Sequence, residues 1–439
     1  MKNYITTAII FLLALSASYS QQEKGIIGYD NWLDSWTEFR PSHIDYNEPT
    51  EILSGDISEN TTLSKRNTYL LLGDVFVTNN ATLIIEPGTV ILGDFKTKGS
   101  LTISKGSKII AEGTQTDPII FTSSKTVKKP GDWGGIFVLG NAPINNYGNE
   151  NSINYGLRPT DFEHISYGGN NKEDNSGILK YVRVEFAGKR TKEFGNFNGI
   201  TLAGVGRETV LYNVMVSYCE GTAFNIMGGD LVLVKLVSYK NSQNDYKFNY
   251  GTQCNITNSL AIRNPYISSP EGSGCLYVSS YDKKEDADPA KNYTTVSAEN
   301  ITLVNISNDL ENDINIGLVQ EAIYIGNDTS FVIDKSVISG FNPAVMFDRN
   351  IVLNDENLRK IKFVRTYFNN CNGNIYRTGF SNNDDLESWY GSRAFNNLYS
   401  KGPDSETFID ATHNKYPDYR LKVNKIIASN DYFDDENED

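Results

Sequence analysis

The residues best suited to chemistry lie close together between positions 170 and 190. Asn170, Glu173 and Asp174 offer carboxylate and amide oxygens, the ligands that calcium prefers. Arg183 and Lys189 follow, and either could serve as the base that removes a proton beside a sugar carboxylate while calcium neutralises that carboxylate. The same residues also fit a solvated turn followed by an ordinary outward strand face, and we favour this plainer interpretation.

A second group of residues is aromatic and could stack on sugar rings. These side chains fall in turns or at strand positions expected to face outward: Trp133, Tyr167, Tyr181, Tyr218 and Tyr239. The alternative is that the rings stack on one another between neighbouring repeats. For Trp133 we favour the second interpretation, whereas for the tyrosines both stay open.

Other catalytic chemistries find little support. Hydrolysis of a glycosidic bond needs two carboxyl groups at a defined spacing, but Asp245, Glu321 and Asp348 fall in separate repeats. The chain contains only three histidines, and none stands in a pattern with cysteine or with a serine nucleophile. Zinc binding and nucleophilic catalysis are therefore not expected.

The elements that must position these residues are revealed by internal repeats. ATLIIEPGTVI (Ala81–Ile91) and GSLTISKGSKII (Gly99–Ile110) share one pattern of short alternating strands separated by a glycine turn. Longer units follow, each with three short strands in roughly 20 to 25 residues. A coil of three strands cannot bury its apolar side chains alone, but stacked coils can. The sequence therefore predicts an all-β right-handed parallel β-helix; a sandwich would need frequent hairpin turns, which are scarce.

The chain is expected to divide into four segments. Residues 1–20 read as a secretory signal peptide, because Lys2 precedes an apolar stretch too short to span a bilayer and small residues follow. Residues 21–70, with Trp32 and Trp36, are predicted to cap the leading end of the helix. Residues 71–380 form the β-helix, and residues 381–439 form a second cap with an acidic tail.

Charge and cysteine content limit the possible partners. The net charge of −14 disfavours nucleic acid and anionic lipid as ligands, and no transmembrane segment is expected once the signal is removed. Four cysteines occur, of which Cys254 and Cys275 lie about one repeat apart. In an oxidising compartment these two could form a disulfide, although buried free thiols are an equal alternative.

Several sequence blocks are similar to those of a known family. They are LLGDVFVTNNATLIIEPGTVILGD (Leu71–Asp94), GDWGG (Gly131–Gly135), and YGGN followed by DNSG (Tyr167–Gly177). They resemble secreted right-handed parallel β-helix proteins of Bacteroidota, a mostly uncharacterised group within the pectin-lyase-like superfamily. The resemblance implies export to the periplasm, the outer surface or the medium, and it implies no established activity. The segment NSQNDYKFN (Asn241–Asn249) departs from the Asp-rich loop of such chains, which weakens an ion site there.

Together these observations favour an exported solenoid that binds a polysaccharide or another cell-surface component without catalysis. The alternative is a polysaccharide lyase or glycoside hydrolase, for which the fold gives only an analogy. If the protein is an enzyme, a calcium-assisted lyase is the expected type. Calcium is the one cofactor that the residues suggest.

Overall fold

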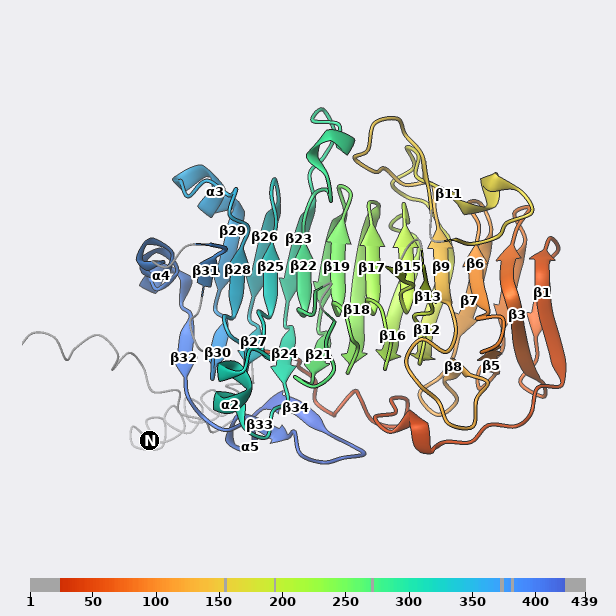
Figure 1. Ribbon diagram of the computed structural model, residues 1–439, viewed down its shortest axis with the longest axis horizontal. Helices are drawn as coiled ribbons and strands as arrows, with labels where there is room; N and C mark the ends of the chain where they lie inside the picture. Colours follow the sequence, from red (N-terminus) through yellow and green to blue (C-terminus); the bar gives the residue numbers. More distant parts are fainter. Residues whose placement is uncertain are drawn as a thin grey trace, which may run out of the picture.

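The structure, a computed structural model, describes residues 24–153, 156–192, 195–269, 272–371, 375–379 and 383–422. The predicted signal peptide and the acidic run 431–439 lie outside these residues. The chain winds into a right-handed parallel β-helix built on one sheet of 28 strands (Figure 1). The predicted fold class is confirmed.

Three columns of parallel strands form the sides of the helix, which we name faces A, B and C in chain order. Face A contains β2 (Thr61–Leu63), β4 (Thr82–Ile85), β7 (Lys108–Glu112), the first halves of β12 (Gly177–Glu185), β16 (Val210–Ser217) and β18 (Asp230–Tyr239), β20 (Gln253–Thr257), β23 (Thr295–Glu299), β26 (Ser330–Asp334) and β29 (Ile361–Val364).

Face B contains the first halves of β1 (Glu51–Ile57) and β3 (Thr68–Val77), β5 (Val90–Gly93), β8 (Ile119–Ser123), the second halves of β12, β16 and β18, β21 (Leu260–Arg263), β24 (Thr302–Asn305), β27 (Val337–Ser339), β30 (Tyr367–Asn369) and β32 (Leu398–Ser400). Face C contains the second halves of β1 and β3, β6 (Ser100–Ile103), β9 (Gly135–Leu139), β15 (Ile200–Ala203), β17 (Phe224–Met227), β19 (Tyr246–Asn249), β22 (Leu276–Val278), β25 (Ile323–Ile325), β28 (Val345–Phe347) and β31 (Ile375–Arg377).

The core is a column of apolar side chains stacked in register from coil to coil. On face A, Leu211, Leu233, Ile256, Ala298 and Ile333 occupy equivalent positions on successive strands, and each is buried. Strand alternation directs these residues inward, and each side chain packs on its equivalents in the coils above and below. The period-2 pattern in the sequence is therefore the direct cause of the fold.

From β12 onward, the corner between faces A and B turns on a single residue in the left-handed backbone region. The residues at this corner share a φ near +50°, and they are Tyr181, Asn213, Lys235, Asn258, Asn300, Lys335 and Arg365. Asparagine tolerates this conformation best among the residues that have a Cβ, which accounts for three of the seven. The corner has the same length in each of these coils and keeps the strands in register.

The other two corners vary in length and carry the insertions. The corner between faces C and A carries residues 140–176, 279–294 and 348–360, including η2 (Phe162–Ile165), η3 (Lys284–Asp286) and α3 (Asp355–Lys360). The corner between faces B and C carries α2 (Leu310–Asn315) and the ribbon β13 (Arg190–Thr191)–β14 (Gly195–Asn196). A second ribbon pairs β10 (Asn151–Ser152) with β11 (Ser166–Tyr167).

Residues 24–47, expected as part of a cap over the leading end, lie instead along the outer surface of face B (Figure 1). The outward residues of this face are large and apolar, so they need a cover. Ile26, Trp36 and Phe39 pack on Val237 and Ile262 and are buried with them. We call residues 24–47 the strap; it includes η1 (Pro41–His43). The first coil consists of β1 and β2.

The C-terminal residues complete the cover of face B and close the far end. The hairpin β33 (Phe408–Asp410)–β34 (Asp418–Leu421) packs beside the strap, and Arg420 donates hydrogen bonds to the carbonyls of Gly28 and Tyr29. Leu386 and Tyr390 of α4 (Asp384–Tyr390) enter the core over the last coils. The remaining short helices are η4 (Arg393–Phe395) and α5 (Asp404–Thr407).

The four cysteines are all free thiols, so the pair considered from the sequence, Cys254 and Cys275, is not bonded. Both thiols are buried in the core, and burial raises the pKa of each. No helix within the described residues is both long and apolar enough to cross a membrane.

The stacked core predicts that truncating an inward residue is costly and truncating an outward one is not. Ile256→Ala should lower the free energy of unfolding by about 2–5 kcal/mol, because the neighbouring coils cannot collapse into the cavity. Val232→Ala, on the outer side of the same face at 46% exposure, should change it by less than about 0.5 kcal/mol. Chemical denaturation of both variants measures the difference. Equal losses would contradict the in-register core.

Candidate functional site

Arg183, a candidate base, faces outward on face B as expected but is buried beneath the strap. Its Nη2 donates to the hydroxyl of Tyr46 at 2.9 Å, and its Nε lies 3.1 Å from Glu185 Oε1. Burial alone would lower the pKa of this guanidinium, but Glu185 and Tyr46 raise it. Arg183 therefore stays charged and helps to hold the strap, and it lines neither of the two cavities described below.

Lys189, the other candidate base, lies at the corner between faces B and C. Burial lowers its pKa, although the carboxylate of Asp74 opposes this. The Nζ atom is 2.8 Å from Asp74 Oδ1 and 4.4 Å from the ring centre of Phe197. The lysine is thus engaged in a buried ion pair, and it lines neither of the two cavities described below.

The loop proposed to bind calcium is on a third side of the molecule, at the corner between faces C and A. Asn170 and Glu173 are exposed, and Glu173 lies 3.8 Å from Arg207. Asp174 is half-buried and accepts a hydrogen bond from Ser176 Oγ at 3.1 Å. Burial raises the pKa of Asp174 despite that bond. Across the described ranges, no three His, Cys, Asp or Glu side chains are grouped so that they could hold a metal ion.

The aromatic residues predicted to stack on sugars are covered by other parts of the chain. Trp133 is fully buried, donates from Nε1 to the carbonyl of Glu185 and stacks on Phe121. Tyr167, itself part of the insertion 140–176, is buried in an apolar cluster with residues of face C. The others lie under the strap: Tyr181 meets Trp36, Tyr239 meets Phe39, and Tyr218 packs on Tyr239. Ring-on-ring packing, the alternative weighed from the sequence, describes this arrangement.

A groove of about 1080 Å³ lies across the corner between faces C and A. Its floor is the short turn Gly326–Ser330 that joins β25 to β26. One wall comes from the insertion 279–294 in the coil before, and the other comes from the insertion 348–360 in the coil after. In Figure 1 these walls are the green loop that leads into β23 and the blue segment around α3. The groove exists because the middle coil lacks an insertion.

Two tyrosine–carboxylate hydrogen bonds link successive coils at this groove: Tyr281 and Asp328 line it, whereas Tyr324 and Asp348 are connected to it through Asn327, which lines it. Tyr281 donates to Asp328 Oδ2 at 2.6 Å, and Tyr324 donates to Asp348 Oδ2 at 2.6 Å. Asn327, which lines the groove, also donates to Asp348. Burial alone would raise the pKa of Asp348, but the bonds from Tyr324, Asn327 and its other neighbours together lower it. The donors and acceptors are therefore held in fixed positions.

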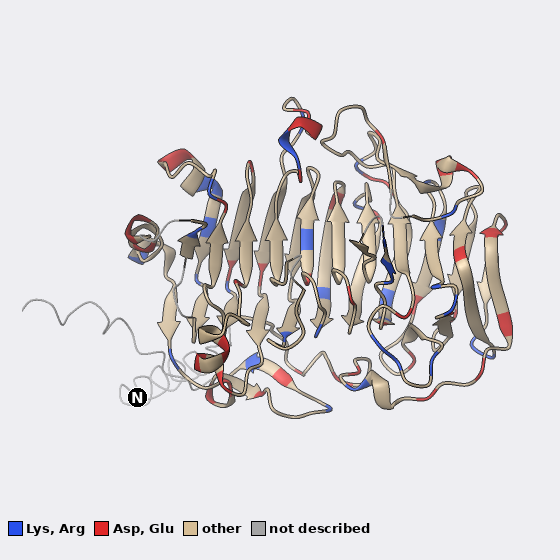
Figure 2. Ribbon diagram, in the orientation of Figure 1, with Lys and Arg blue, Asp and Glu red and all other residues tan. Residues whose placement is uncertain are grey.

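Opposite charges are balanced among the lining residues. The groove is lined by the acids Asp282, Glu285 and Asp328 and by the lysines Lys283, Lys284 and Lys360. Figure 2 shows both signs on the two insertions that form the walls. Gln253, Asn292, Asn350 and Asn357 add uncharged hydrogen-bonding groups, and Tyr293 adds an aromatic ring that is 40% exposed.

Sequence reasoning missed this site for a physical reason. The groove depends on which coils carry insertions and which coil between them does not, and its residues come from segments more than a hundred positions apart. Asp348 was considered as an acid, but the tyrosine that orients it was not. The charged run Asp282–Asp286 and the unusual spacing between β22 and β23 were the available signals.

A smaller cavity of about 210 Å³ lies beside the groove, lined by Asn170, Gly229, Asp230 and Lys291 among others. The insertions 140–176 and 279–294 meet above it. Lys291 Nζ donates to the carbonyl of Asn146, and Asp288 N donates to the carbonyl of Asn145. This contact between distant insertions fixes one wall of the groove.

Comparison with known proteins agrees with the fold. The family model described as a pectate-lyase-like β-helix domain matches residues 55–403. The chain belongs to this family. Two solved structures are similar to this family member: an alginate lyase from Paenibacillus sp. str. FPU-7, at 10% identity over 80% of this chain and 98% of that chain with a TM-score of 0.27, and the pectate lyase Pel9A, at 13% identity over 90% and 93% with a TM-score of 0.33. No curated protein matches the sequence.

The position of Arg183 in this β-helix protein predicts a structural role for that residue. Arg183→Ala should lower the free energy of unfolding by about 3–5 kcal/mol, because it leaves the buried Glu185 without its partner. Lys180→Ala, which removes an exposed ion pair from the same strand, should cost at most about 1 kcal/mol. Denaturation of both variants provides the measurement. A variant at position 183 with wild-type stability would contradict this role.

Proposed function

We propose that this β-helix protein binds an uncharged polysaccharide, without catalysis, in the groove across the corner between faces C and A. The observation that carries the proposal is the groove itself, with fixed hydrogen-bonding groups on its floor and both walls. We further propose that the protein acts outside the inner membrane, as the predicted signal peptide indicates.

The dimensions of the groove fit a chain of sugar rings. Its volume is at the upper end of the range for ligand sites, which is about 300–1,000 Å³. The two walls belong to coils two steps apart, and two coil spacings amount to about 10 Å. A single extended polymer could therefore lie across the corner, with its hydroxyl groups facing Asp328, Asn327 and Asn350.

The charges favour a neutral ligand over an acidic one. The three lysines of the groove are offset by three acids, and Lys284 and Lys360 already lie near Asp328 and Glu356. The net charge of −14 adds a general repulsion toward polyuronates. Pectate and alginate are therefore expected to bind poorly.

Two features support binding without catalysis. The pKa of Asp348 is lowered, while burial and a carboxylate partner raise the pKa of Tyr281 and of Tyr324. These shifts move the pKa values of the three side chains away from neutral pH, whereas a general acid or base works best with a pKa near the working pH. The residues considered for a calcium-assisted lyase, Arg183, Lys189 and the Asp174 loop, lie on three different sides of the helix. We therefore propose that binding requires no metal.

An array of neutral and acidic polysaccharides tests this function. Wild-type protein should retain a neutral glycan equally well in calcium and in EDTA. Tyr293→Ala should weaken that binding by about 0.5–1.5 kcal/mol, roughly two- to tenfold, because a ring that can pack on a sugar is lost. The matched control is Tyr416→Ala, a tyrosine 51% exposed on the hairpin beside face B, and it should bind like wild type.

Three results would count against the proposal. These are no retention of any glycan, preferential binding of pectate or alginate, and release of reducing or unsaturated ends during incubation. The last would establish the alternative, a lyase or hydrolase.

The binding constant should be nearly independent of pH between about pH 5 and pH 8. Asp348, with its pKa below the usual 3.8, stays ionised over this window, and Tyr281 and Tyr324, with pKa values above the usual 10.0, stay protonated. Affinity should fall below about pH 4, as Asp348 takes up a proton and its hydrogen bonds from Asn327 and Asn350, which line the groove, are weakened. Calorimetric titration at several pH values measures this. A bell-shaped dependence centred near neutrality would instead indicate acid–base chemistry.

A further inference from the structure

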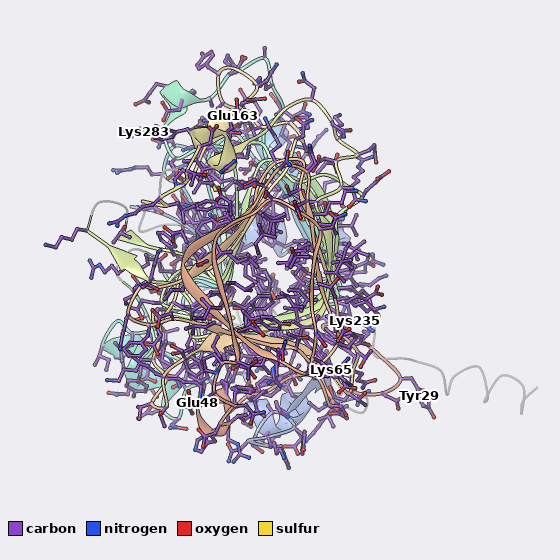
Figure 3. All side chains as sticks on the ribbon, turned by 90° about the vertical axis from the view of Figure 1, so that its right-hand side faces the viewer. Tyr29, Glu48, Lys65, Glu163, Lys235 and Lys283 are labelled. Carbon is purple, nitrogen blue, oxygen red and sulfur yellow. The ribbon has the colours of Figure 1, made fainter. Side chains whose placement is uncertain are left out.

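The first coil of the helix presents an open strand edge. β1 pairs with β3 on one side, and β2 pairs with β4 on one side. Within the described part of the chain, no strand pairs with the opposite side of either. Figure 3 looks onto this end of the molecule. An unpaired edge exposes a row of backbone donors and acceptors, which is a template for another β-strand.

Apolar side chains of the first coil are more exposed to solvent than the equivalent side chains of the next coil. Leu53 and Ile57 pack against the core but are only half-buried, whereas their partners in β3, Leu71 and Val77, are fully buried. Ile52 is 62% exposed. The opposite end of the column is closed by α4, and the strap, which could have closed this one, lies along face B instead. The leading coil is thus the part of the described core that is left uncovered.

We propose that two copies of the chain join end to end through their first coils, with their β1 and β2 strands antiparallel. The two copies are related by a two-fold axis that is perpendicular to the solenoid axis and passes through the corner of β1 at Ser54. This axis places face B of one copy on face C of the other, and face A on face A. All three faces can therefore pair at once across the junction. Such an interface is self-complementary, as two-fold symmetry requires.

The sequence of the edge fits this pairing. With Ser54 opposite its own copy, Glu51 faces Ile57, Ile52 faces Asp56, and Leu53 faces Gly55, so no two like charges oppose each other. On face A, Thr62 of β2 faces its own copy. β1 also lacks lysine and proline, two residues that commonly block strand edges. Self-pairing therefore meets no electrostatic or backbone obstacle at this edge.

Sedimentation and light scattering of the signal-free chain give the first measurement. At about 50 µM the protein should have twice the mass of one chain. Ile52→Glu should give a monomer with an unchanged unfolding midpoint, because the added carboxylate would face Asp56 of the other copy and repel it. Val232→Glu, at an exposed β-branched residue on face A, should remain dimeric. A monomeric wild type, or a dimeric Ile52→Glu variant, would overturn the proposal.

Cross-linking tests the register independently. Opposed residues in antiparallel strands have Cα atoms about 4.5–5.5 Å apart, within the range of a disulfide. Ser54→Cys and Thr62→Cys should therefore each form a covalent dimer on oxidation, whereas Ser297→Cys, exposed on face A, should not. The native thiols contribute little background because three are buried and Cys371 is half-buried in the chain. A solution dimer without cross-linking at positions 54 and 62 would place the contact elsewhere and refute this geometry.

Discussion

Each coil of this protein depends on the coil above and the coil below it. A ring of three short strands has no interior of its own, so its inward leucines, isoleucines and valines become buried only when further rings stack on both sides at the spacing of β-strands. In-register stacking fixes which residues point inward, and it follows that the outward residues of the three faces have to be covered or left to solvent. Face B, rich in apolar outward residues, is covered by the strap and the C-terminal hairpin. The insertion 140–176 covers the early coils of face C.

The three corners of the helix differ in how much their length varies from coil to coil. From β12 onward, the corner between faces A and B turns on one left-handed residue in each coil, so its length is constant over this part of the helix. The corner between faces C and A accepts long insertions without disturbing the strands, because the extra residues leave the coil and return to it. The groove exists because this corner accepts insertions. Its walls are insertions in two coils, and its floor is the uninterrupted turn between them.

The fold was predictable because its cause is local. Alternating residues and glycine turns recur in each coil, and the pattern at Ala81–Ile91 suffices to define a strand pair. The site was not predictable, since its causes are not local. Arg183 and Tyr239 do face outward, as alternation requires, but residues more than a hundred positions away bury them. For Trp133 the sequence favoured packing against another ring, and it does stack on Phe121 inside the core, although no pattern around the GDWGG motif identifies that partner.

The strap has a consequence for the order of assembly. Lys24 and Gly25 hydrogen-bond to the carbonyls of Arg365 and Lys335, contacts that span more than three hundred residues of sequence. The strap therefore cannot reach its native position until the late coils exist, even though it is synthesised before them. Contacts of such long range are slow to form. Until then the apolar outer side of face B is exposed to solvent. The folding intermediate is therefore prone to aggregation, and a chaperone would be most needed at this stage.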